Sequence, residues 1–332
     1  RRRDYLPSAL YDTIALKIQS TNEITRKIVC KISVHEVEYD FADISKIVIR
    51  EKEKIFLKKK NKLNKAQFLH KGRKMVIESY LTVKGTSEEN EDIIGYERNY
   101  FWIMDGVTNL FNTNIFDYGS DSRVLVEKVS CALKKNIDDS RSLEEIIYKA
   151  ILSVSGDFSE VISKFPNIKK YELPTFTIAL VRELAKNKFE YYVLGDSPII
   201  VEGEKKITDS RLNKLTKEFF CKDEINNDII KKEKLIQIRK KLNTEGGYWI
   251  GSVDGLGIKY GKFGSFDTNP NQRVIICSDG FSNLFQNNEE LLDFKFSPDN
   301  IIKQIGDKYY SEILGFSDSV KKRDDLSIIV VK

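Results

Sequence analysis

Three apolar runs in this sequence have an aspartate at one end. They are residues 100–104 followed by Asp105, residues 273–277 leading to Asp279, and residues 326–331 preceded by Asp324. A carboxylate at the end of a buried strand is costly unless a positive charge lies on it. If a sheet brings such strand ends together, their oxygens form the kind of site that Mg²⁺ or Mn²⁺ prefers. We therefore expect a fold in which these strand ends meet.

Histidine and cysteine usage limits the chemistry further. The two histidines, His35 and His70, lie in the first 72 residues, so the rest of the chain has no histidine for a Ser-His-Asp triad, a Cys-His pair or a zinc site. Any catalysis there is expected to use carboxylates, a metal, or both. The four cysteines are scattered without CxxC spacing, as in reduced intracellular proteins, and no apolar run approaches the roughly 18 residues of a membrane span. We predict a cytoplasmic protein without a transmembrane segment.

Charge is divided unevenly along the chain. Residues 1–72 hold 17 Lys and Arg against 9 Asp and Glu, whereas the other residues hold 38 against 41. We predict a basic N-terminal extension of unknown role over residues 1–72 and a larger domain over residues 73–332. The lysine-rich run 58–62 is interpreted as a solubilising linker, with an acidic partner or membrane surface as the alternative. No aromatic residues interleave with the basic ones, so no nucleic-acid partner is expected.

Hydrophobic periodicity predicts strands and helices that come in pairs. Predicted strands include residues 75–83, 100–104, 175–181, 189–194, 273–278 and 326–331. Predicted helices include residues 8–25, a helix capped by Asp121, a helix capped by Ser142 with Glu145 in a capping box, and two helices within 211–243. Because there is no βαβ alternation, these elements predict an antiparallel α+β fold with helices packed on sheets.

Five acidic motifs occur in an order that resembles the type 2C (PPM family) metal-dependent serine/threonine protein phosphatases. They are Asn90-Glu91-Asp92, Met104-Asp105-Gly106, Gly195-Asp196-Ser197, Ser278-Asp279-Gly280 and Asp324-Asp325-Leu326-Ser327. The resemblance covers roughly residues 74–332, and the chain looks like a divergent, bacterial-like branch. It implies a four-layer α-β-β-α sandwich of two antiparallel sheets, in agreement with the paired elements.

The resemblance also implies two Mg²⁺ or Mn²⁺ ions and a ligand set. It assigns Asp105 as the bridge between the two ions. Asp279 and Asp324 would be further ligands of the first ion, and Glu91 and the Gly106 carbonyl would be ligands of the second. Asp92 would orient a metal-bound water. Two cations would neutralise a phosphate dianion and lower the pKa of the water between them. The implied reaction is hydrolysis of phosphoserine and phosphothreonine in a protein substrate.

Other acidic residues have weaker assignments. Asp254 and Glu172 are candidates for a third metal, although Asp254 also fits an ordinary turn residue. Asp196 is interpreted mainly as a turn residue after its strand, and Asp325 as structural.

Two departures from the family pattern favour a second hypothesis. Ser87 stands where many members have a phosphate-gripping arginine, and Val107-Thr108-Asn109 follows Asp105-Gly106 without the histidine that serves some members as leaving-group acid. The alternative is therefore a catalytically weak or inactive pseudophosphatase that binds phosphoproteins. A third hypothesis makes the basic segment 1–72 the active part, as a tether to an acidic surface.

Overall fold

The protein is described by a computed structural model. The described residues are 17–18, 28–32, 35–39, 66–70, 73–111, 113–116, 119–220, 228–309 and 323–332. The chain divides into two compact units, Arg1–Lys62 and Leu63–Lys332. This division precedes the predicted boundary at residue 72, because strand β4 (Ala66–His70) pairs with β5 (Arg73–Val83) of the larger unit.

The smaller unit contains one antiparallel sheet in the order β1-β2-β3. Its strands are β1 (Lys17–Ile18), β2 (Ile28–Ile32) and β3 (His35–Tyr39). Lys17 and Ile18 fall inside the predicted helix 8–25 but form a strand, because they pair with β2. The rest of that predicted helix lies outside the described residues.

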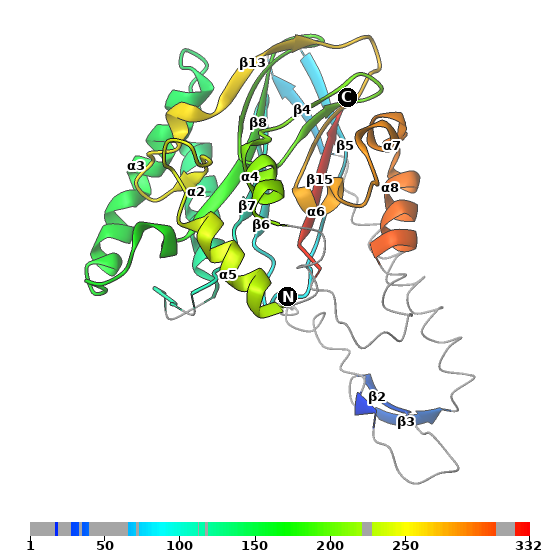
Figure 1. Cartoon of the computed structure of the whole chain (residues 1–332). Helices are drawn as coiled ribbons and strands as arrows, with labels where there is room; N and C mark the ends of the chain where they lie inside the picture. Colours follow the sequence, from blue (N-terminus) through cyan, green and yellow to red (C-terminus); the bar gives the residue numbers. More distant parts are fainter. Residues whose placement is uncertain are drawn as a thin grey trace, which may run out of the picture. The chain divides into compact units, whose positions relative to one another are not determined.

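The larger unit contains two antiparallel sheets (Figure 1). The first sheet has the order β11-β10-β14-β15-β5-β4, and its further strands are β10 (Ile199–Val201), β11 (Lys205–Ile207), β14 (Val274–Cys277) and β15 (Leu326–Val331). The second sheet has the order β13-β9-β8-β7-β6. Its strands are β6 (Asp92–Glu97), β7 (Tyr100–Gly106), β8 (Thr175–Ala185), β9 (Lys188–Leu194) and β13 (Lys262–Asp267). The short strand β12 (Gly251–Ser252) pairs with β8.

Helices cover the outer face of each sheet. Helices α2 (Asp121–Asn136) and α3 (Leu143–Ile162) share a core with the second sheet. Helices α6 (Asp279–Ser282), α7 (Asn288–Asp293) and α8 (Pro298–Gln304) share one with the first sheet. A third core lies between the two sheets. These three cores separate four layers, so the predicted α-β-β-α sandwich is confirmed.

Strand β7 shows why this sequence fits a middle layer. Tyr100, Trp102 and Met104 point into the core shared with α2 and α3, while Phe101 and Ile103 point into the core between the sheets. Successive side chains of a strand face opposite ways, so a strand buried on both sides must be apolar throughout. The strand was predicted from this continuous run.

Strand β6 was not predicted, because Gly95 interrupts its apolar pattern. A Cβ at Gly95 would lie 2.1 Å from the Trp102 ring, which packs over the glycine on the neighbouring strand. Glycine in a strand often marks such a close approach. As a result, Asp92 begins a strand instead of preceding a turn.

The predicted helix starts are confirmed for α3 and shifted for α2. Ser142 accepts a hydrogen bond from the Glu145 amide in a full capping box. The N-cap of α2 is Ser120, and Asp121 is its first helical residue. The Asp121 carboxylate instead accepts hydrogen bonds from the amides of Ile115 and Phe116, which fixes the preceding loop.

Helices α4 (Arg211–Phe219) and α5 (Asp228–Arg239) are the two predicted within residues 211–243. They share a small core centred on Leu215, Ile238 and Tyr248. Short elements complete the unit: η2 (Lys170–Glu172), η4 (Ile258–Tyr260) and the π-helical η5 (Ile305–Tyr309). In the part of the chain with assigned structure, none of the helices is long and apolar enough to cross a membrane.

Candidate active site

Strands β6 and β7 place two predicted site residues side by side. Asp92 is the register partner of Asp105, and the Gly106 amide donates a 3.1 Å hydrogen bond to the Glu91 carbonyl. A Cβ at Gly106 would lie 3.0 Å from that carbonyl oxygen, so this position needs glycine for the close approach. Glu91, Asp92, Asp105 and Gly106 therefore lie together at one end of the second sheet.

The first sheet brings Asp279 and Asp324 together in the same way. The Ser278 amide, at the end of β14, donates a 2.9 Å hydrogen bond to the Ser327 carbonyl at the start of β15. Asp279 then begins α6, and a Cβ on Gly280 would lie only 1.9 Å from the Asp325 carbonyl oxygen. The first turn of α6 is thus packed directly against the beginning of β15.

The two groups of acids meet across the sandwich. The carboxylates close enough to raise the pKa of Asp105 by repulsion are Asp92, Asp279, Asp324 and Asp196. Asp105 and Asp92 come from the second sheet and Asp279 and Asp324 from the first, so the sequence-predicted ligands converge at the junction of both sheets. Asp196, interpreted from sequence mainly as a turn residue, lies in the same cluster.

Burial is the main cause of the unusual ionisation of this cluster. It raises the pKa of Asp92 and Asp105, and neighbouring negative charges raise both further. The pKa of Asp279 is raised by burial and by the charge of Asp196, while hydrogen bonds with Asp105, the Gly280 amide and Asn283 oppose the shift. Asp324 keeps an exposed edge, yet partial desolvation and the charge of Asp279 raise its pKa too. These carboxyl groups therefore bind protons more readily than exposed carboxylates do.

Two hydroxyl groups fix the Glu91 side chain. Thr108 Oγ1 donates a 2.8 Å hydrogen bond to one carboxylate oxygen, and the Ser120 hydroxyl donates to the other. The Ser120 hydroxyl therefore does not cap α2, although Ser120 is its N-cap residue. Its amide donates instead to Glu89. Sequence analysis did not identify these two hydroxyl donors, because they come from the loop before α2 and have no motif of their own.

Asp325 connects residues 85–91, which lead into β6, to the start of β15. Its carboxylate is buried and accepts 2.6 Å hydrogen bonds from the amides of Gly85 and Glu91. This agrees with the structural role expected from sequence. The same charge lies near Glu91 and contributes to raising its pKa, after the larger effect of burial.

Arg123 on α2 is a further residue that the sequence did not indicate. Its Nη1 donates to the carbonyl oxygens of Asn90 and Asp92 at 2.8 and 2.9 Å. Its other nitrogens pair with Glu127, one turn further along the helix. The arginine therefore holds the backbone on both sides of Glu91 without touching a carboxylate of the cluster.

The donor chemistry of the cluster fits a divalent cation. Asp92 Oδ2 is buried and has no hydrogen-bond partner, and the surrounding donors are all hard carboxylate oxygens. At the same time, no group of three His, Cys, Asp or Glu side chains among the described residues is arranged to hold a metal ion as it stands. Side-chain adjustment would have to accompany binding of an ion.

Asp254 and Glu172, the candidates for a third metal, make local hydrogen bonds. Asp254 accepts hydrogen bonds from Ser252 Oγ and the Leu256 amide, as a turn residue does. Glu172 accepts a hydrogen bond from the Lys169 amide at the start of its own short helix. A third metal site at these two acids stays a prediction.

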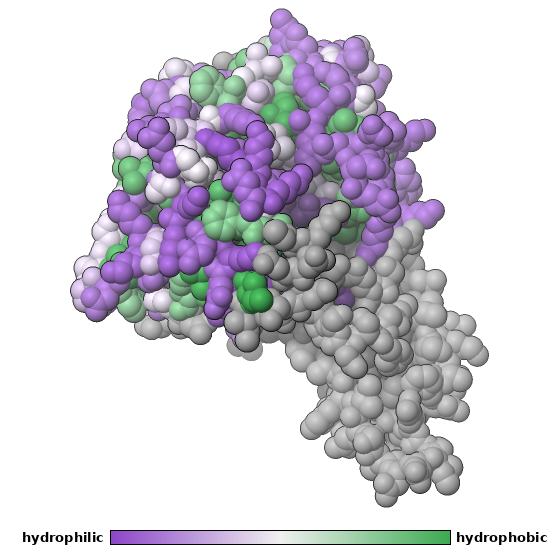
Figure 2. Space-filling view, viewed as in Figure 1, coloured by the Kyte–Doolittle hydropathy of each residue, from purple (hydrophilic) through white to green (hydrophobic). Residues whose placement is uncertain are grey.

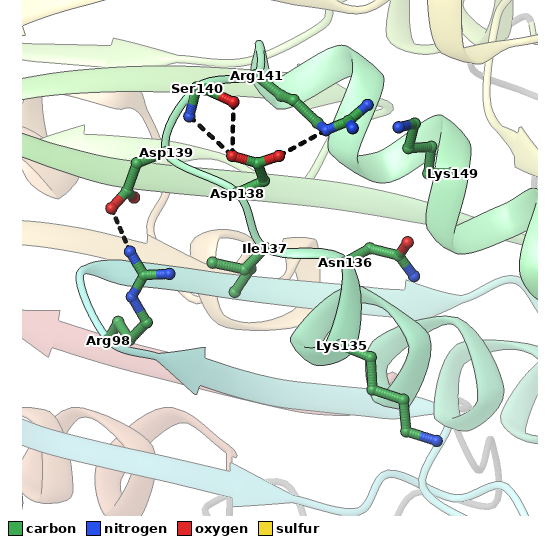
Figure 3. Close-up of a pocket in the computed structure, with 9 residues that line it drawn as sticks. All are labelled: Arg98, Lys135, Asn136, Ile137, Asp138, Asp139, Ser140, Arg141 and Lys149. Atoms are coloured by element: carbon green, nitrogen blue, oxygen red, sulfur yellow. Dashed lines mark hydrogen bonds and ion pairs between the residues drawn. The ribbon is translucent and has the colours of Figure 1, made fainter.

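A polar pocket lies at the other ends of β6 and β7 (Figure 3). It is lined by Arg98 and by the turn between α2 and α3, where Arg98 pairs with Asp139 and Arg141 pairs with Asp138. Hydrogen bonds from Ser140 and Arg141 lower the pKa of Asp138 to about 2. Both arginines already have carboxylate partners, and the acidic cluster lies at the opposite strand ends, so this pocket is separate from it.

Comparisons with known proteins identify similar solved structures at low identity. No protein-family model matches the sequence, and no curated protein matches it. The Mycobacterium tuberculosis serine/threonine phosphatase PstP/Ppp is 16% identical, covering 76% of this chain and 97% of its own, with a TM-score of 0.49. The PPM Ser-Thr phosphatase MsPP from Mycobacterium smegmatis is 17% identical, covering 76% and 97%, with a TM-score of 0.46. The PstP catalytic domain in complex with two manganese ions is 15% identical, covering 76% and 96%, with a TM-score of 0.48.

These structures are similar to the chain, and they belong to serine/threonine phosphatases.

Proposed function

We propose that this chain is a metal-dependent phosphatase that hydrolyses phosphoserine and phosphothreonine in proteins. The observation that supports this most is the meeting of carboxylates from both sheets around Asp105. Burial and mutual repulsion raise the pKa values of these groups, and Asp92 Oδ2 lacks a hydrogen-bond partner. Such a cluster is stabilised by cations, and cations are what hydrolysis of a dianionic phosphate monoester requires.

In this proposal the chain's own residues have distinct roles. Asp105, Asp279 and Asp324 would hold one Mg²⁺ or Mn²⁺ ion, and Glu91 and the Gly106 carbonyl the other. When bound, the ions supply positive charge for the phosphate and make a water molecule more acidic. The Asp92 carboxylate, with its unpartnered Oδ2, would orient that water. Thr108 and Ser120 keep the Glu91 carboxylate oriented.

A pseudophosphatase is the second candidate, and two observations favour it. Ser87 replaces the arginine found in many members of the resembled family, and Val107-Thr108-Asn109 follows Asp105-Gly106 without the histidine that serves some members as leaving-group acid. Such a protein would bind metal or phosphoprotein without turnover.

Hydrolysis of p-nitrophenyl phosphate with Mn²⁺, Mg²⁺ or EDTA distinguishes the two candidates. We expect metal-dependent turnover that Asp279→Ala abolishes. Asp267→Ala is the matched control, because Asp267 is exposed and lies at the far end of the second sheet. Mn²⁺ binding without turnover would favour the pseudophosphatase, and turnover in EDTA would contradict both candidates.

A further inference from the structure

We propose that the α4–α5 helical pair is a docking surface for acidic residues that flank the phosphorylated residue of the substrate. This inference deepens the proposed function, on which it rests, by naming the class of peptide that the site selects.

The pair is strongly basic. Residues 211–219 and 228–241 contain nine Lys and Arg against three Asp and Glu. Two of the cations are structural, because Arg211 pairs with the buried Asp209 and Arg239 is itself buried. The remaining lysines that are exposed on the surface are Lys214, Lys217, Lys231, Lys232, Lys240 and Lys241.

These six lysines have no carboxylate partner among the residues that the structure describes. Lys241 lies over the Phe219 ring at 5.1 Å, and none of the six takes part in an ion pair seen there. Figure 2 shows hydrophilic side chains over much of the face on which α4 and α5 lie in Figure 1. Clustered charge of one sign attracts ligands of the other sign and accelerates their association.

The pair lies directly beside the acidic cluster. Val107, which follows Gly106, packs against the α4–α5 core. At the end of α5, the Arg239 guanidinium donates to the carbonyls of Tyr171 and Leu173, just before β8 begins. The Val107 amide in turn donates to the Thr175 carbonyl of β8 at 2.9 Å. A peptide with its phosphate at the cluster therefore passes close to this pair.

The segment that leads into the cluster has the opposite charge. Glu88 and Glu89 are exposed and lie three and two positions before Glu91 in the chain. Acidic residues of a substrate are repelled by these two carboxylates and attracted toward the lysines of α4 and α5.

The test compares two phosphopeptides that differ only in having Asp and Glu, or Lys and Arg, next to one phosphothreonine. We expect the acidic peptide to be the better substrate. The variant Lys231→Glu/Lys232→Glu should lower kcat/KM for it about tenfold at low salt through KM. Turnover of p-nitrophenyl phosphate, which has no flanking residues, should stay unchanged. Lys186→Glu/Lys188→Glu is the matched control, because both lysines are exposed at the β8–β9 turn, at the far end of these strands.

Binding keeps the surface testable whether or not the chain has phosphatase activity. Fluorescence anisotropy with the unphosphorylated acidic peptide should show binding that weakens in Lys231→Glu/Lys232→Glu and with added salt. Loss of p-nitrophenyl phosphate turnover alone would count against the proposed function and leave this binding intact. Equal kcat/KM for both phosphopeptides would overturn the inference. So would equally tight binding of a single-stranded oligonucleotide or of anionic vesicles, because the surface would then attract any polyanion.

Discussion

At the residue scale, Asp325 combines a stabilising contact with an unfavourable charge. It accepts one buried and one partly buried amide hydrogen bond, and both join residues more than 230 positions apart in sequence. Its negative charge also adds to the repulsion felt by Glu91. Hydrogen bonds to a buried charge are strong, and loss of the acceptor leaves two amides unsatisfied. We therefore expect the structural contact to outweigh the repulsion.

The first prediction concerns Asp325→Ala. We expect the free energy of unfolding to fall by about 2 kcal/mol, the effect of orphaning buried donors. Urea denaturation followed by circular dichroism measures it. Asp267→Ala, at an exposed position, should change stability by less than about 0.5 kcal/mol. An unchanged urea midpoint for Asp325→Ala would show that relief of repulsion offsets the lost hydrogen bonds.

The second prediction concerns Arg123, which we regard as a positioning residue for Glu91 and Asp92. Arg123→Met removes the two hydrogen bonds of Nη1 with the Asn90 and Asp92 carbonyls and keeps a long side chain at this position. We expect Mn²⁺ affinity to fall about tenfold, as for other residues that orient metal ligands. Isothermal titration calorimetry measures it without relying on activity.

Glu127→Gln is the control for Arg123. It removes the charge of the partner one turn along α2 and leaves the two carbonyl contacts in place. We expect Mn²⁺ affinity within about twofold of the unaltered chain. If both variants lose Mn²⁺ affinity equally, Arg123 acts through its ion pair within α2 and not through its hydrogen bonds to the Asn90 and Asp92 carbonyls.

At the element scale, α6 depends on a glycine that permits contact with β15. A Cβ at Gly280 would lie 1.9 Å from the Asp325 carbonyl oxygen, which is backbone and cannot swing away. By contrast, a Cβ at Gly156, inside α3, has nothing within 4 Å. The two glycines therefore predict opposite effects of the same substitution.

The third prediction compares these two positions. Gly280→Ala should destabilise the protein by about 1–3 kcal/mol, because α6 or β15 must shift. Gly156→Ala should stabilise it by about 0.5–1 kcal/mol, since alanine is the better helix former. Thermal unfolding of both variants checks the pair, and a stable Gly280→Ala variant would mean that α6 can move away from β15 easily.

Elements were predictable where their signal was local. The capping box at Ser142 and the apolar run of β7, which is buried on both faces, each depend on residues that are close together in sequence. Helix α3 and strand β7 could therefore be predicted. Strand β6 did not, because Gly95 is explained only by the Trp102 ring of its partner strand. Helix α6 is four residues long, too short for a periodic pattern.

The residues of the candidate site also differ in whether they could be predicted from sequence. Asp105, Asp279 and Asp324 were predicted because each stands beside an apolar run, whereas Glu91 and Asp92 were assigned through the family resemblance. The structure brings these five acids together. Thr108, Ser120 and Arg123 were not predicted, because each acts on residues 17 to 33 positions away through the folded chain.

At the scale of the whole molecule, the cluster brings together carboxyl groups from two sheets. When these groups are ionised, their repulsion opposes closure of the sandwich, and a bound cation would reverse that effect. A ligand that binds only the folded state stabilises it in proportion to the logarithm of its concentration over Kd.

The fourth prediction follows from this repulsion. We expect millimolar Mn²⁺ to raise the melting temperature, and EDTA to lower it. Asp279→Asn should melt above the unaltered chain in EDTA, because one repelling charge is gone, and should respond less to Mn²⁺. Differential scanning fluorimetry measures both. A lower melting temperature for Asp279→Asn in EDTA would show that its hydrogen bonds matter more than its charge.

The position of β15 has a consequence for how the protein is made. This strand lies inside the first sheet, between β14 and β5, although β5 is the second strand of the larger unit and β15 its last. On a ribosome that adds about 5–20 residues per second, β5 emerges roughly 10–50 s before its central partner. During that interval the edge of β5 that pairs with β15 in the folded protein has no partner strand and can pair with other chains. We infer that the nascent chain needs shielding at β5 until its last strand has been synthesised.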